Sequence, residues 1–177
     1  LDRDAVSRAA EAHRVCPFEM ALDLSEWCDV IICDYNYLFD PTVNLKRYFS
    51  EKKGDYVFLI DEAHNLPDRG RDMYTAELAK SEVLALRRQA GKGEKALWAM
   101  LGRLNSALLA LRPFCGEDGT ASLPEIPEEL LPALRLFTLQ CGEWLESHRE
   151  HPLRHETLSL WFSVRFFLRI AELYGPE

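Results

Sequence analysis

Two carboxylates and a histidine follow directly after an apolar run in the first half of the chain. The run covers residues 56–60, and Asp61, Glu62 and His64 come immediately behind it. A buried strand would deliver these acids at its carboxyl end. There, Asp61 could hold Mg²⁺ through water, and Glu62 could orient and deprotonate an attacking water. These residue types at this spacing predict one half of a nucleotide-hydrolysis site.

The phosphate-binding half of such a site does not occur in the sequence. The pattern G-x-x-x-x-G-K-[ST] is absent, and residues 91–95, Gly-Lys-Gly-Glu-Lys, have the wrong spacing to cradle phosphates. Residue 1 lies in a charged segment, and residue 177 follows an apolar segment without an obvious stop. We therefore expect an internal fragment of a motor protein, without nucleotide hydrolysis of its own.

Composition excludes several classes of protein. With 47% hydrophobic and 28% charged residues, the chain is globular, and its 177 residues suffice for one domain or two small lobes. It has no signal peptide and no apolar run of the roughly 18 residues that span a bilayer, so we expect a cytoplasmic protein. A net charge of −8 predicts that this chain alone binds nucleic acid weakly.

Two short groups of basic residues stand out against this acidic background. One lies within residues 46–53, and the other consists of Arg87, Arg88, Lys92 and Lys95. Either group could contact nucleic acid, and solvated helix or turn faces account for them about as well. The sequence leaves both interpretations open.

The five cysteines form neither a C-x-x-C pair nor a zinc-ligand spacing, so we predict no disulfide framework and no zinc site. Four of them are expected to be small core residues, because free cysteine behaves as a buried hydrophobe. These four are Cys28, Cys33, Cys115 and Cys141. Cys16 differs from them because Pro17 and Phe18 follow it.

Three motifs occur in order within about fifty residues. They are Cys-Pro-Phe-Glu at 16–19, Asp-Val-Ile-Ile-Cys-Asp-Tyr-Asn-Tyr-Leu-Phe-Asp-Pro at 29–41, and Asp-Glu-Ala-His at 61–64. This combination resembles the XPD/DinG family of iron–sulfur superfamily 2 DNA helicases. Glu19 and Leu22 bring it closer to the bacterial members of that family.

The resemblance implies roles for individual residues. Asp61 would coordinate Mg²⁺, and Glu62 would act as the general base in ATP hydrolysis. His64 would couple the nucleotide site to the other motor lobe, although it could also merely cap the strand end. Cys16 would be the last of four ligands to a [4Fe–4S] cluster, with the other three expected upstream of Leu1. We therefore expect this chain by itself to carry no cluster.

The family pattern also has a tyrosine after Cys-Pro and an arginine four residues beyond it, and both touch single-stranded DNA. The corresponding residues here are Phe18 and Leu22, so the arginine contact is lost. Phe18 could still stack on a base, an interaction worth roughly 1–3 kcal/mol. A core aromatic is the alternative interpretation.

The predicted fold class is α+β and mostly α. Residues 1–74 are expected to hold the end of the iron–sulfur region and part of a RecA-like motor lobe. Strands at 29–34 and 56–60, joined by a helix at 42–50, would form a β-α-β unit of an incomplete sheet. Residues 2–14 and 19–27 are expected to be helical.

Residues 75–177 are expected to form a helical bundle, at the position where XPD-like helicases carry their Arch domain. The predicted helices cover 76–90, 94–112, 127–149 and 153–174. The apolar stripes of the last three are Leu97, Met100, Leu101, Leu104, Leu108 and Leu111; Leu130, Leu134, Phe137, Cys141, Trp144 and Leu145; and Leu158, Trp161, Phe162, Phe166, Leu168, Ile170 and Leu173.

The resemblance implies an ATP-dependent DNA helicase of DNA repair that moves 5′→3′ on single-stranded DNA. This chain would be an inactive part of it. The competing interpretation is a non-enzymatic helical module that docks a partner protein, with the Asp-Glu-Ala-His segment there by coincidence. We also expect the chain to self-associate, because the predicted strands would expose apolar faces and unpaired edges.

Overall fold

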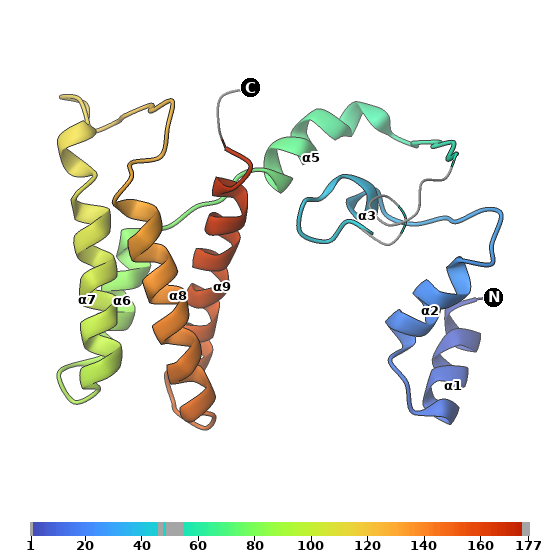
Figure 1. Cartoon of the computed structure of the whole chain (residues 1–177), viewed down its shortest axis with the longest axis horizontal. Coiled ribbons are helices and arrows are strands. Elements are labelled where there is room, and N and C mark those ends of the chain that lie inside the picture. Colours follow the sequence, from blue (N-terminus) through green and yellow to red (C-terminus); the bar gives the residue numbers. More distant parts are fainter. Residues whose placement is uncertain (1, 46–47, 49–54, 175–177) are drawn as a thin grey trace. The chain divides into compact units, whose positions relative to one another are not determined.

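The computed structural model describes residues 2–45, 48 and 55–174. The chain divides into two compact units, Leu1–Ile60 and Asp61–Glu177 (Figure 1). The domain boundary predicted between residues 74 and 75 stays a prediction. Within the described ranges, no helix is long and apolar enough to cross a membrane.

Four helices of the second unit form a bundle, as the sequence predicts. They are α6 (Lys80–Ala90), α7 (Lys95–Leu109), α8 (Leu130–Ser147) and α9 (Arg154–Ala171). Each helix packs on the next along the chain, and α9 returns to contact α6 (Figure 1). The four helices therefore surround one shared hydrophobic core.

The bundle core follows from the apolar stripes of α7 and α8. All six stripe residues predicted for α8 are buried, and so are the first four of α7. Leu97, Leu101 and Leu134 have no exposed surface. Steps of three and four residues place such side chains on one helix face, so a single continuous core can bury them.

The face that α9 turns to the core is partly mispredicted. Its buried residues are Thr157, Leu160 and Val164, whereas Phe162 is 55% exposed, and Leu173, beyond the end of the helix, is 50% exposed. Helix α9 is apolar on several faces, so periodicity does not reveal which face packs inward. The contacts with α8 and α6 decide it instead.

The segment leading to the bundle contains a helix that the sequence analysis missed. A 3₁₀ turn, η1 (Ala63–Asn65), runs into α5 (Leu66–Met73). Pro67 lies in the first turn of α5, and Asp68 pairs with Arg71 one turn later. The helix has only eight residues and is mostly polar, so it contains too few apolar side chains to indicate a core-facing helix.

The first unit is held by two packed helices, α1 (Arg3–His13) and α2 (Pro17–Ser25). The Asp2 carboxylate caps α1 by accepting a 2.7 Å hydrogen bond from the Ala5 N–H. Ala10 is buried at 1% exposure. Both helices agree with the sequence prediction within a few residues.

The predicted β-α-β unit is wrong for the described residues, which contain no strand. The segments 29–34 and 55–60 lack regular secondary structure, and the short helix α3 (Asn36–Phe39) follows the first. Of the helix predicted at 42–50, residues 42–45 form a turn and irregular chain, and residues 46, 47, 49 and 50 lie outside the described residues. A strand requires a hydrogen-bonded neighbour, and two strands alone are marginally stable at best.

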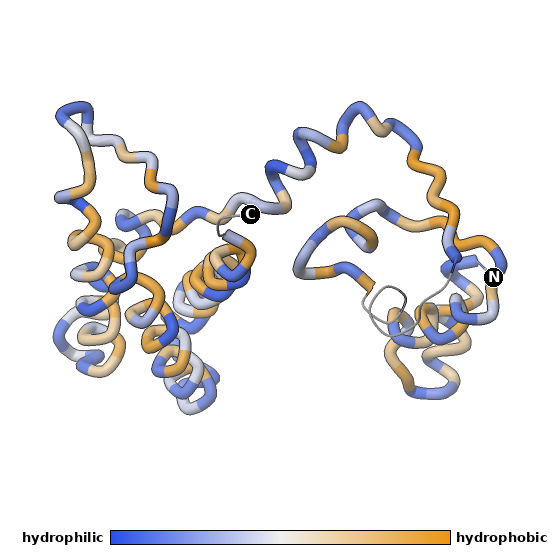
Figure 2. The backbone as a smooth tube through the Cα atoms, turned by 45° about the horizontal axis from the view of Figure 1, so that its top comes forward, coloured by the Kyte–Doolittle hydropathy of each residue, from blue (hydrophilic) through white to orange (hydrophobic). Residues whose placement is uncertain are grey.

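Consequently, the apolar side chains of these two segments stay uncovered. Ile32 is 96% exposed and Leu59 is 94% exposed, although both segments are strongly hydrophobic (orange in Figure 2). Exposed apolar runs of this kind favour association with another surface. Self-association of the chain stays a prediction that these exposures support.

Candidate active site

Asp61 and Glu62 lie in a turn between the extended segment 55–60 and the 3₁₀ turn η1. An Asp61 carboxylate oxygen, Oδ1, accepts a 2.9 Å hydrogen bond from the Glu62 N–H. Glu62 has φ 49° and ψ 37°, a left-handed conformation that is unusual outside glycine. Such a backbone costs on the order of 1–3 kcal/mol, which the Asp61 hydrogen bond helps to offset.

The left-handed turn brings Glu62 and His64 together. Glu62 Oε2 lies 3.3 Å from His64 Nδ1, and both side chains are well exposed. An ion pair at such an exposed position is worth at most about 1 kcal/mol. Glu62 can therefore leave His64 at little cost and turn its carboxylate to another partner.

The oxygen donors of this turn fit Mg²⁺. Mg²⁺ in phosphate-handling sites keeps several waters and takes one or two carboxylates, with the substrate phosphates completing the octahedron. A carboxylate has about four lone-pair positions, so Asp61 remains able to bind while it accepts the Glu62 N–H. No group of three metal-binding side chains occurs among the described residues, so a phosphate substrate would have to complete the coordination.

Cys16 is positioned by helix α2. It is the N-cap residue, its carbonyl accepts a 3.0 Å hydrogen bond from the Met20 N–H, and Pro17 begins the helix. The Cys16 thiol makes no capping hydrogen bond and is exposed. It is thus available as a ligand at the surface of the first unit.

Phe18 is the second residue of the same helix and is 46% exposed. Its ring centroid lies 6.3 Å from that of Tyr37, and the two rings are tilted by 30°. The structure thereby brings the first two motifs, residues 16–19 and 29–41, into contact. Phe18 is not a fully buried core aromatic, and part of its ring surface is open to a further partner.

The cysteines predicted to be core residues differ among themselves. Cys28, Cys33 and Cys115 are exposed, which corrects the prediction, because the segments that carry them pack against little else. Although Cys33 is exposed, partial desolvation of its thiol raises its pKa, with a smaller contribution from the charge of Asp34. Cys141 is buried in the bundle as predicted, and burial raises its pKa to about 12, so it remains a thiol.

A [4Fe–4S] cluster needs four thiolates, and the described residues do not supply them in one place. Cys16 is one surface thiol, and the Cys28 thiol donates to the Leu24 carbonyl at 3.5 Å. The side chains of this chain therefore do not fit a complete cluster by themselves. Cys16 belongs to the first unit and Asp61, Glu62 and His64 belong to the second, and each group is described within its own unit.

One protein-family model covers the part of the chain that holds Cys16, Asp61, Glu62 and His64. Residues 1–83 match the DEAD_2 family model, and this range includes all three motifs. The DEAD_2 family comprises XPD-like helicases. This match over residues 1–83 confirms the predicted resemblance to XPD-like helicases, while the bacterial type stays a prediction.

Curated relatives match less than half of the chain. The Fanconi anemia group J protein homolog of Gallus gallus is 33% identical over 76 residues, which are 43% of this chain and 6% of that protein. Regulator of telomere elongation helicase 1 of Homo sapiens is 35% identical over 66 residues, 37% of this chain and 5% of that protein. The Caenorhabditis elegans homolog of that regulator is 30% identical over 83 residues, 47% of this chain and 8% of that protein. The chain thus spans less than a tenth of the length of these relatives, and no solved structure matches it.

Proposed function

We propose that the chain is part of an ATP-dependent DNA helicase of the XPD/DinG type. The observation that carries this proposal is the Asp61–Glu62–His64 turn at the end of an extended apolar segment inside the DEAD_2 match. The similarity to regulator of telomere elongation helicase 1 of Homo sapiens, 35% identical over 66 residues, supports the proposal. We extend the proposal to DNA repair and to 5′→3′ movement on single-stranded DNA.

In the proposed reaction, a water attacks the γ-phosphorus of ATP and the bond to the ADP oxygen breaks. Glu62 accepts the proton of that water, since its exposed carboxylate is free to turn away from His64. Asp61 would hold Mg²⁺, which would supply positive charge to the phosphate oxygens. His64, which contacts Glu62, couples the nucleotide site to the second motor lobe.

In the longer protein, the extended segments 29–34 and 55–60 would gain the strand neighbours that a RecA-like sheet provides. Residues 1–74 would then be the end of the iron–sulfur region and part of the motor lobe, and residues 75–177 would be the Arch-like domain. Cys16 would ligate the [4Fe–4S] cluster, and Phe18 would stack on a base of single-stranded DNA.

The competing interpretation, a non-enzymatic interaction module, is weakened by the family match. The DEAD_2 match includes the Asp-Glu-Ala-His segment together with the two earlier motifs, which is difficult to reconcile with coincidence. The bundle of α6 to α9 could still bind a partner protein in addition.

The decisive experiment uses the longer protein that contains this chain. We expect it to hydrolyse ATP in a manner stimulated by single-stranded DNA, and to unwind a duplex that carries a single-stranded tail. The 177-residue chain should do neither, because G-x-x-x-x-G-K-[ST] is missing from it. A longer protein that binds a partner but shows no DNA-stimulated hydrolysis would support the competing interpretation.

Cys16 offers a separate test of the proposed cluster. Cys16→Ser in the longer protein should remove most of the bound iron and sulfide and the visible absorption of the cluster. Cys28→Ser is the matched control, because Cys28 is also an exposed thiol of the first unit and should leave the cluster intact. Equal iron content in the Cys16 variant and the unmodified protein would contradict the assignment.

A further inference from the structure

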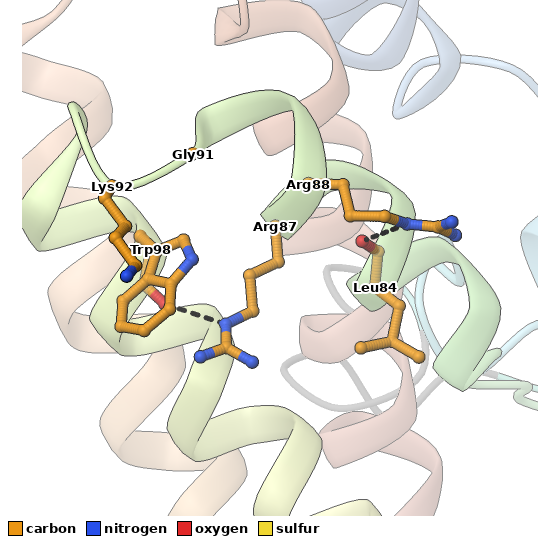
Figure 3. A pocket seen from close by; sticks show the side chains of 6 residues that line it. All are labelled: Leu84, Arg87, Arg88, Gly91, Lys92 and Trp98. Atoms are coloured by element: carbon orange, nitrogen blue, oxygen red, sulfur yellow. Dashed lines mark hydrogen bonds between the residues drawn. The ribbon is translucent and has the colours of Figure 1, made fainter.

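A small pocket lies at the turn between α6 and α7, beyond the DEAD_2 match. It has a volume of about 220 Å³. Its lining combines three cationic side chains with one indole, and Figure 3 shows how they lie. The lining residues are Leu84, Arg87, Arg88, Gly91, Lys92 and Trp98.

Arg87 is held in place by Trp98. Its guanidinium carbon lies 4.1 Å from the centre of the Trp98 ring, and its Nε donates a 3.3 Å hydrogen bond to the Trp98 carbonyl. Figure 3 shows the Arg87 side chain, from α6, and the Lys92 side chain, from the turn, both running toward the indole. A guanidinium fixed in this way loses little further freedom on binding a ligand, so it is pre-organised to receive an anion.

Arg88 and Lys92 add exposed charge at the rim. The Arg88 Nε donates to the Leu84 carbonyl at 3.3 Å, which points its side chain along α6. Lys92 sits between two glycines, and Gly91 has φ 58°, a conformation that glycine adopts without strain. Because both neighbours of Lys92 in the sequence are glycines, no adjacent side chain covers the lysine.

The nearest acid in the sequence does not cancel this charge. Glu94 contacts His151 in the loop between α8 and α9, with 3.3 Å between Glu94 Oε1 and His151 Nε2. Residues 87–95 thus contain Arg87, Arg88, Lys92 and Lys95 against a single acid that is turned to another partner, in a chain of net charge −8. A local positive field of this kind attracts an anion and not a cation.

The pocket size decides among anionic ligands. Pockets for drug-sized or cofactor ligands measure about 300–1,000 Å³, so 220 Å³ suits a smaller group. One phosphodiester with its sugar meets both features of the lining, because the cations bind the phosphate and the indole packs on the sugar or base. An acidic protein segment would use the charge but would leave the indole without a matching group.

We propose that this pocket binds one phosphodiester unit of single-stranded DNA, at a site on the helical bundle separate from the motor residues. The proposal rests on the proposed function for the identity of the nucleic acid. Arg87 and Lys92 contact the phosphate, Arg88 attracts the neighbouring phosphate, and Trp98 packs on the sugar or base. The bundle would thereby hold the strand while the motor turns over.

The test measures binding of a fluorescently labelled oligothymidylate to the 177-residue chain by anisotropy at several salt concentrations. We expect weak binding at low salt, with a dissociation constant of about 10⁻⁴ M or a smaller value. The double variant Arg88→Gln/Lys92→Gln should weaken binding roughly tenfold. It should also reduce the steepness of the plot of log association constant against log salt concentration by about 0.7 per lost phosphate contact. Both side chains are exposed, so these changes spare the bundle core.

The matched control is Arg135→Gln/Arg149→Gln, which removes the same charge from exposed positions on α8 and the loop after it. It should change the affinity less than twofold. Equal loss in the two double variants would overturn the proposal, since net charge alone would then explain binding. Absence of binding at low salt, or equally tight binding of polyglutamate at the same pocket, would also overturn it.

These outcomes are separable from the proposed function. A longer protein that retains DNA-stimulated ATP hydrolysis while both double variants bind alike would refute the pocket and leave the helicase assignment intact. Loss of binding confined to the pocket variant, in a longer protein without ATP hydrolysis, would support the pocket and refute the helicase assignment.

Discussion

Glu62→Gln in the longer protein should lower the rate of ATP hydrolysis by about 10²–10⁴-fold, the usual contribution of a general base. The amide has the shape of the carboxylate, but it cannot accept the proton of the attacking water. ATP binding should change little, because Asp61 and the phosphate-binding residues remain. Phosphate release and binding of a fluorescent ATP analogue, measured on the same preparation, give the two quantities.

Glu77→Gln is the control for this change, since Glu77 is also exposed and lies in the second unit, outside the Asp61–His64 turn. It removes the same charge and should leave turnover unchanged. If Glu62→Gln kept more than about a tenth of the normal rate, Glu62 would not be the general base.

The bundle could be predicted because its signal is local. On α8 the apolar residues recur every three or four positions, so sequence alone identified all six residues that the structure buries. Neighbouring helices then only had to supply the opposite wall of the core. Such a pattern determines both the element and the face that packs.

Helix α9 shows where that argument ends. Because α9 is apolar around much of its circumference, its sequence fixes the helix and leaves the buried face open, and Phe162 was placed inside although it is exposed. The segments 29–34 and 55–60 show a second limit. Their composition favours strands, but a strand is stabilised by partners distant in sequence, and the described residues provide none.

For the candidate site, too, the sequence identified some features and the structure was needed for others. Residue order alone indicated Asp61, Glu62, His64 and Cys16, because the motifs are short and contiguous. The contact between Glu62 and His64 needed coordinates, since it depends on the left-handed conformation of Glu62. Sequence drew attention to the basic residues after residue 86 but not to Trp98, whose contact with Arg87 forms only when the chain reverses between α6 and α7.

Leu134→Ala should destabilise the bundle by about 2–5 kcal/mol, because Leu134 is completely buried and its removal leaves a cavity that the surrounding helices only partly fill. Leu139→Ala is the matched control on the same helix, at a position that is 63% exposed. Both changes replace leucine by alanine within α8, so their effects on helix propensity are alike and small. Leu139→Ala should therefore shift the free energy of unfolding by no more than about 0.5 kcal/mol. Urea unfolding followed by helical circular dichroism measures both, and similar losses for the two variants would mean that the core is not centred on α8.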